Sequence, residues 1–130
     1  MGIRLAVSDL VEFPVLVSIS DQGGALKPFK LTLLGDRLVG DDFQAEAGKI
    51  DAARDALRDD PGGNAYFDAV RDIVVRRVRG WVSQDLVLDD LTGEPAPFSP
   101  EAFAAALGVA GLPMLIFKAY FAAQGAREGN

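Results

Sequence analysis

The chain has 130 residues and a formal net charge of −6, and it contains no cysteine and no histidine. This length suits a single domain, 1–130, and the missing residue types exclude disulfides, thiolate metal sites and histidine-based catalysis. Because an acidic chain repels phosphate backbones, we expect no nucleic-acid partner, and we also expect no metal, no other cofactor and no enzymatic activity.

The sequence contains no run of apolar residues long enough to cross a membrane. Its longest apolar run, 112–117, is far shorter than a bilayer-spanning helix, and the N-terminus lacks the apolar core of a signal peptide. We therefore expect a cytoplasmic protein without a membrane partner.

Two apolar runs near the N-terminus predict a β-hairpin. The runs 13–19 and 29–34 are rich in β-branched and large apolar residues, and 20–24 supplies a polar turn with two glycines. Because two strands alone are marginally stable, the hairpin needs a third strand or a helix on its apolar face, and 1–10 is a candidate for that strand. The hairpin region is predicted to span 1–38.

A mostly helical region is predicted over 41–125, beginning with a surface helix after Asp41 or Asp42. Apolar residues recur in it at helical spacing, with charged residues between them. This stripe consists of Phe43, Ala47, Ile50 and Leu57. The sequence Asp-Asp-Pro-Gly-Gly at 59–63 ends the helix.

A second helix is predicted to follow Asn64, with a wide apolar stripe for the core. The stripe consists of Phe67, Val70, Ile73, Val74, Val78 and Trp81. Four arginines lie off it: Arg71, Arg76, Arg77 and Arg79. They can form a solvated face that complements the helix dipole, a patch for phosphates, or a docking site for an acidic partner surface. The last interpretation makes them candidate partner-binding residues.

An acidic segment follows, in which 82–88 can be extended. Its carboxylates, Asp85, Asp89, Asp90 and Glu94, can either hold a hard cation or form a solvated turn at 90–93. Their spacing differs from that of a calcium-binding loop, so we expect the turn.

Two short helices are predicted to end the chain. Ser99 suits the cap of the first one and Pro100 its first position. The last helix, 112–124, is apolar on every side, so it is either fully buried or shared with a partner. Under the second interpretation the contact residues are Met114, Phe117, Tyr120 and Phe121, and polar replacement of Phe117 and Phe121 abolishes assembly without unfolding the protein. The residues 126–130 are expected to form a flexible tail.

The order of the C-terminal features resembles the tail assembly chaperones of long-tailed bacteriophages and prophages. The features are Gly80-Trp81, an acidic turn ending in Gly93, Pro-Ala-Pro-Phe-Ser-Pro-Glu at 95–101, a Leu-Gly break, and Lys-Ala-Tyr-Phe-Ala-Ala-Gln-Gly at 118–125. The resemblance covers most of the chain and is specific from Gly80 onward. It departs in the turn, where Leu91-Thr92 lengthens the family's Asp-x-Gly.

The resemblance implies a viral protein that acts by protein–protein interaction in the host cytoplasm and is absent from the finished virion. Such chaperones coat the tape measure protein and help recruit tail tube subunits, so these two proteins are the implied partners, and self-association also fits. The alternatives are a structural phage tail component, which predicts a β-rich sandwich, and a small acidic protein-interaction domain of another role. The expected fold class is α+β, with an N-terminal antiparallel hairpin or small sheet before a mostly helical remainder.

Overall fold

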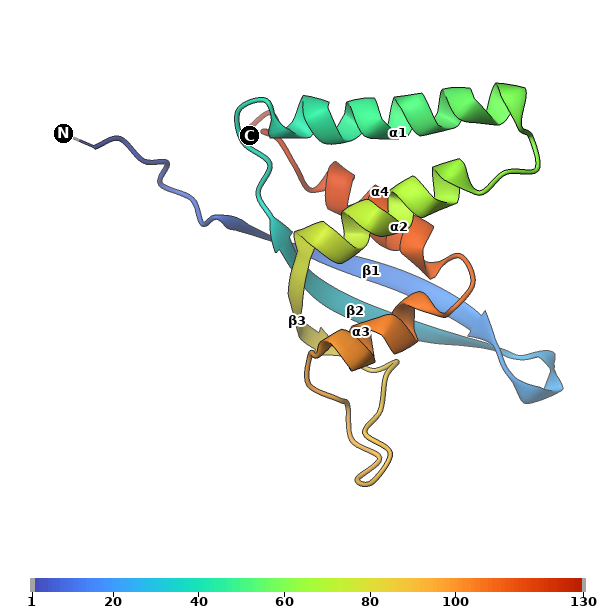
Figure 1. The fold of residues 1–130 in the computed structure, drawn as a ribbon. Helices are drawn as coiled ribbons and strands as arrows, with labels where there is room; N and C mark the ends of the chain where they lie inside the picture. Colours follow the sequence, from blue (N-terminus) through green and yellow to red (C-terminus); the bar gives the residue numbers. More distant parts are fainter. Residues whose placement is uncertain (1, 130) are drawn as a thin grey trace.

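The computed structural model, which describes residues 2–129, contains a three-stranded antiparallel sheet and four α-helices, and it confirms the predicted α+β class (Figure 1). The elements in chain order are β1 (Leu10–Ser20), a 3-10 turn (Gln22–Gly24), β2 (Leu26–Asp36), α1 (Asp42–Asp59), α2 (Ala65–Arg77), β3 (Val78–Gln84), α3 (Pro100–Leu107) and α4 (Leu112–Ala122). The strand order in the sheet is β1-β2-β3.

Strands β1 and β2 form the predicted hairpin, and both are longer than predicted. Their pairing runs from Leu10 opposite Asp36 to Ser20 opposite Leu26. Gly35, which we expected to lie beyond the second strand, is inside it and faces Tyr120. A Cβ atom at this position would lie 2.7 Å from Cε1 of the tyrosine ring, so glycine allows the close packing.

The third strand is β3, and the expectation that 1–10 supplies it was wrong. Residues 2–9 form no strand, and Met1 lies outside the described residues. Strand β3 pairs antiparallel with β2, with Trp81 opposite Leu33. The predicted helix therefore ends at Arg77, because the next residues satisfy the backbone groups along the open edge of β2.

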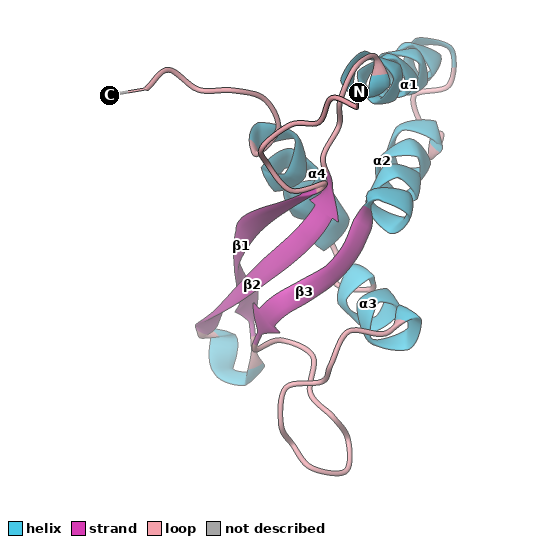
Figure 2. Cartoon of the chain, turned by 90° about the vertical axis from the view of Figure 1, so that its left-hand side faces the viewer, coloured by secondary structure: helices cyan, strands magenta, loops and turns pink. Residues whose placement is uncertain are grey.

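The helices lie on one side of the sheet and leave the other side open (Figures 1 and 2). Helix α4 packs on β1, α2 packs on α4, and α1 covers α2 as an outer layer. The most deeply buried residues of this core are Phe13, Leu31, Leu33, Ile73, Val74, Leu112, Ile116 and Tyr120. Helix α4 thus lies directly on the sheet, and α2 lies between α4 and α1.

The helix ends follow the sequence signals to different degrees. Ser99 caps α3 as predicted, since its hydroxyl accepts a hydrogen bond from the Ala102 amide at 3.0 Å. Asp41 and Asn64 occupy the N-cap positions of α1 and α2, but neither side chain makes a capping hydrogen bond. Of the described part of the predicted tail, 126–129 has no regular secondary structure, and Asn130 lies outside the described residues.

No single helix among residues 2–129 is long and apolar enough to cross a membrane. Helices α3 and α4 have the required length and composition only when they are taken together, and they meet at an angle of 107°.

Candidate protein-binding groove on helix α2

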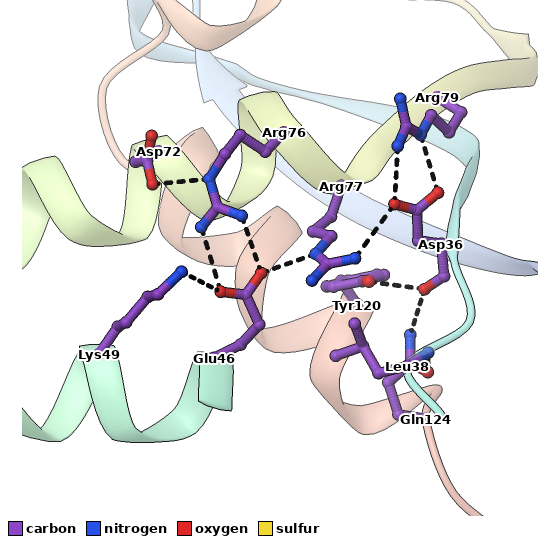
Figure 3. A network of polar contacts seen from close by, with 10 residues as sticks. All are labelled: Asp36, Leu38, Glu46, Lys49, Asp72, Arg76, Arg77, Arg79, Tyr120 and Gln124. Carbon is purple, nitrogen blue, oxygen red and sulfur yellow. Dashed lines mark hydrogen bonds and ion pairs between the residues drawn. The ribbon is translucent and has the colours of Figure 1, made fainter. Parts of the chain in front are cut away.

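Three of the four arginines of the predicted basic patch are held by carboxylates of the same chain (Figure 3). The acceptors are Glu46 on α1 and Asp36 at the end of β2. Arg76 and Arg77 bind Glu46, and Arg79 binds Asp36. Three of these guanidiniums therefore already have carboxylate partners within the chain, and the assignment of the four arginines to partner binding stays a prediction.

Glu46 is the centre of this ion-pair cluster and has only 1% of its surface exposed. It receives two parallel hydrogen bonds of 3.1 Å from Arg76 and one of 2.7 Å from Nε of Arg77. Burial by itself would raise the pKa of the Glu46 carboxyl, but the hydrogen bonds from Arg76 and Arg77 outweigh it and lower the pKa to about 2. The carboxylate is therefore charged and joins α1 to the end of α2.

Asp36 forms the second half of the ion-pair cluster. Its carboxylate accepts hydrogen bonds from Nε and Nη2 of Arg79 at 2.8 and 2.9 Å, and Nη1 of Arg77 lies 3.4 Å away. The hydrogen bonds from Arg79 lower the pKa of Asp36 more than burial raises it. Arg77 lies between the two carboxylates, so the cluster links β2, α1 and the junction of α2 with β3.

The backbone carbonyl of Asp36 also fixes the C-terminal helix. It accepts hydrogen bonds from the Tyr120 hydroxyl at 2.6 Å and from Nε2 of Gln124 at 3.1 Å (Figure 3). Oε1 of Gln124 accepts a hydrogen bond from the Leu38 amide at 2.9 Å. These bonds attach α4 to the end of β2, so Tyr120 and Gln124 have structural contacts inside the domain.

Two of the four proposed contact residues of α4 are core residues. Tyr120 is fully buried and Phe117 has 8% of its surface exposed, which corrects their assignment to a surface for partners. Phe121 is half-buried and its ring lies 5.1 Å from that of Phe43 on α1. Met114 is half-buried and lines a hollow of the surface. We now expect a polar residue at position 117 to destabilise the fold, since it would lie in the core.

The acidic segment forms a turn, as predicted. Asp89 accepts hydrogen bonds from the amides of Leu91 and Thr92 at 2.9 and 3.0 Å, and the Gly93 amide donates to the Asp89 carbonyl at 2.8 Å. These bonds to the backbone lower the pKa of the Asp89 carboxyl. Within residues 2–129, no three acidic side chains converge as they would around a metal ion. The carboxylate of Asp89 is thus used to shape the turn.

Two apolar hollows lie along one face of α2, and Arg71 lines both of them. The smaller, of about 210 Å³, lies between α2 and the start of α4 and is lined by Phe67, Asp68, Val70, Arg71, Gly111, Pro113 and Met114. The larger, of about 410 Å³, lies between the end of α2 and α3 and is lined by Arg71, Val75, Val78, Arg79, Phe98, Pro100, Phe103, Ala104 and Leu107. We call the two hollows, with Arg71 between them, the α2 groove.

The α2 side of the groove includes Phe67, Arg71 and Val75, which lie four residues apart on successive turns, together with Asp68 and Val70. Phe67 and Val75 expose 62% and 53% of their surface. We had placed Phe67 in the core stripe of this helix, and the structure corrects that, because α2 packs against α1 and α4 with Val70, Ile73 and Val74 buried and Phe67 exposed. The four-residue spacing of Phe67, Arg71 and Val75 is visible in the sequence. The sequence does not show which side of the helix stays exposed.

Arg71 differs from the other three arginines of the predicted patch. Its Nη1 donates a hydrogen bond of 3.3 Å to the Leu107 carbonyl, at the end of α3. In the described part of the chain it makes no ion pair. Its remaining donors are exposed between the two hollows, so the groove offers an arginine flanked by apolar surface.

A still larger hollow, of about 770 Å³, lies where residues 4–9 meet the end of β2, and its lining includes Arg37 and Arg77. Its walls come largely from the N-terminal segment, and Arg77 is engaged in the ion-pair cluster. The α2 groove is instead built on three helices, which makes it the better-defined binding surface.

When the chain is compared with protein-family models, curated proteins and solved structures, no match is found.

Proposed function

We propose that this protein is a non-catalytic tail assembly chaperone of a phage or prophage, which binds the tape measure protein and helps recruit tail tube subunits. The α2 groove carries this proposal, because it presents exposed apolar side chains and an arginine without a carboxylate partner on a rigid frame. Contiguous apolar surface of this kind is typical of protein–protein interaction sites. The resemblance of the C-terminal segment supplies the class of protein and its partners.

The shape of the domain favours a chaperone over a structural part of the tail. A tail tube component predicts a β-rich sandwich, whereas this chain has a small sheet with helices on one side only. The ion-pair cluster also disfavours binding to phosphates, because Arg76, Arg77 and Arg79 are neutralised within the chain. A small acidic interaction domain of another role remains the alternative, and it would use the same groove.

Co-expression with the products of the neighbouring genes tests the proposal, which expects a tape measure protein and a tail tube protein among them. We expect a complex with the tape measure protein that contains several copies of this chain, measured by light scattering after size exclusion. The same experiment on a groove variant, Phe67→Ala with Val75→Ala, should give no complex. Leu16→Ala, on the open face of the sheet, is the matched control and should bind as the parent protein does.

A lone monomer that co-elutes with neither neighbour would contradict the chaperone proposal. Complex formation that survives in the groove variant would leave the chaperone role standing but would place the contact elsewhere on the surface. The same experiment therefore distinguishes failure of the chaperone role from failure of the groove as the contact site.

A further inference from the structure

We infer that the α2 groove binds an amphipathic helix whose contact face carries one carboxylate with an apolar side chain one helical turn before it and another one turn after it. This inference rests on the proposed function and names the chemistry of the segment that the groove would recognise. It follows from the order of groups along α2, from the walls opposite them and from the state of Arg71.

The order along α2 is apolar, cationic, apolar. Phe67, Arg71 and Val75 follow one another at intervals of four residues, which is about 6 Å of rise along a helix for each step. A second helix lying beside α2 presents its own residues i, i+4 and i+8 at the same intervals. Apolar side chains at i and i+8 would then reach the two hollows, and the residue at i+4 would meet Arg71.

The opposite walls of the groove are also mainly apolar. Met114 and Pro113 face the hollow beside Phe67, while Phe98 and Ala104 face the one beside Val75. Side chains of helices form most of these walls, and the edge strand β3 lines only the larger hollow, through Val78 and Arg79 at its start. An extended peptide along both hollows would leave most of its backbone groups without partners, whereas a helix satisfies its own. The geometry therefore matches the recognition of an amphipathic helix in a groove.

The charge at the centre of the groove identifies the residue at i+4. The other three arginines of the predicted patch are each bound by a carboxylate. Among residues 2–129, Arg71 bonds only to the Leu107 carbonyl and retains further donors. A guanidinium with apolar surface on both sides binds a carboxylate more strongly than it binds a neutral acceptor. Asp68 also lines the smaller hollow, beside Phe67, whereas Arg71 lines both hollows, so a negative charge on the ligand is best placed at the centre, opposite Arg71.

Two synthetic helix-forming peptides test this inference. Both are alanine-based and carry leucine at two positions eight residues apart; midway between these, one peptide has glutamate and the other lysine. We expect the glutamate peptide to shift the amide resonances of the groove residues in a titration of the ¹⁵N-labelled protein. The lysine peptide should bind about fivefold more weakly, since Arg71 is exposed and one such ion pair is worth up to about 1 kcal/mol.

The charge reversal Arg71→Glu tests whether the preference comes from an ion pair between Arg71 and the peptide or from a general loss of contact. We expect this variant to prefer the lysine peptide, which a merely structural role of Arg71 would not produce. Leu16→Ala should keep the parent preference for glutamate. Equal binding of the two peptides, shifts confined to other surfaces, or no binding of either peptide would each overturn the inference.

The peptide result and the co-expression result are independent of each other. If the peptides bind as expected but the tape measure protein does not, the groove recognises acidic amphipathic helices and the chaperone role fails. If the tape measure protein binds and the peptides show no preference for glutamate, the chaperone role stands and the stated chemistry fails.

Discussion

Helix α2 places arginine in two different surroundings about one and a half turns apart. At its C-terminal end, Arg76 and Arg77 meet the buried carboxylate of Glu46, because they lie on the side of α2 that packs against α1. Arg71 is exposed beside two hollows that α2 forms with α3 and with the start of α4. The arginines of one helix thus have a structural role where another element covers them, and they are available to a ligand where the surface is open.

Removal of the buried carboxylate should have the largest effect on stability. We expect Glu46→Ala to lower the free energy of unfolding by about 3 kcal/mol, measured by urea denaturation, because both arginines lose their common partner. The estimate lies at the low end of the range for buried pairs, since Arg76 is partly exposed and also binds Asp72 at 2.8 Å.

Asp55→Ala on the same helix is the control for this prediction. Asp55 and Arg58 form an exposed ion pair at 3.6 Å, which should contribute at most about 0.5 kcal/mol. Equal effects of the two substitutions would mean that the cluster stabilises the fold no more than a surface pair does.

The same carboxylate should make stability depend on pH in the acid range. The pKa of Glu46 is lowered in the folded state from its usual 4.5 to about 2, so the unfolded chain binds the proton more tightly. The stabilisation is then fully present above pH 4.5 and is lost as the pH falls toward 2, and it amounts to about 3 kcal/mol at most. Asp36, whose pKa is also lowered, acts in the same direction.

Thermal unfolding followed from pH 6 to pH 2 measures this dependence. The substitution Glu46→Gln removes the titrating group and should flatten the profile between pH 4.5 and pH 2. Parallel profiles for the parent protein and the variant would assign the acid sensitivity to other carboxyls.

The tyrosine that links α4 to the same region should have a smaller effect. Tyr120→Phe removes the hydroxyl that donates to the Asp36 carbonyl, and we expect a loss of about 1 kcal/mol in the free energy of unfolding. The carbonyl keeps the hydrogen bond from Gln124, so it is not left unpaired. Tyr66→Phe is the control, since that hydroxyl makes only an exposed contact of 3.4 Å with Arg54. An equal loss in the two variants would show that the buried bond adds nothing.

Local signals in the sequence predicted the hairpin and the start of α3, because turn glycines and the capping Ser99 act within a few residues. The sequence did not predict strand β3, because Val74, Val78 and Trp81 have helical spacing, although Val78 and Trp81 lie in the strand. Residues 78–84 form a strand because they pair with the free edge of β2, which is distant in the sequence.

The candidate site was less predictable, for a related reason. The sequence singled out Arg71 and Met114 among its candidate partner-binding residues, and both line the α2 groove. It also grouped Arg71 with three arginines that are held by carboxylates, since the positions of Asp36 and Glu46 relative to α2 are set by tertiary packing. Arg71 differs from these three arginines in that its side chain is exposed without a carboxylate beside it. This difference depends on tertiary packing, which a sequence pattern does not show.

Substitutions in the groove should have the smallest effect on the free energy of unfolding. This small effect would distinguish binding residues from core residues. We expect Phe67→Ala and Val75→Ala each to change the free energy of unfolding by less than about 0.5 kcal/mol, because both side chains are largely exposed and alanine favours the helix. Urea denaturation of the two variants measures this. A loss of about 2 kcal/mol or more would show that these side chains support the core. Near-parental stability together with lost capture of the tape measure protein would separate the binding face of α2 from the buried faces that hold the domain together.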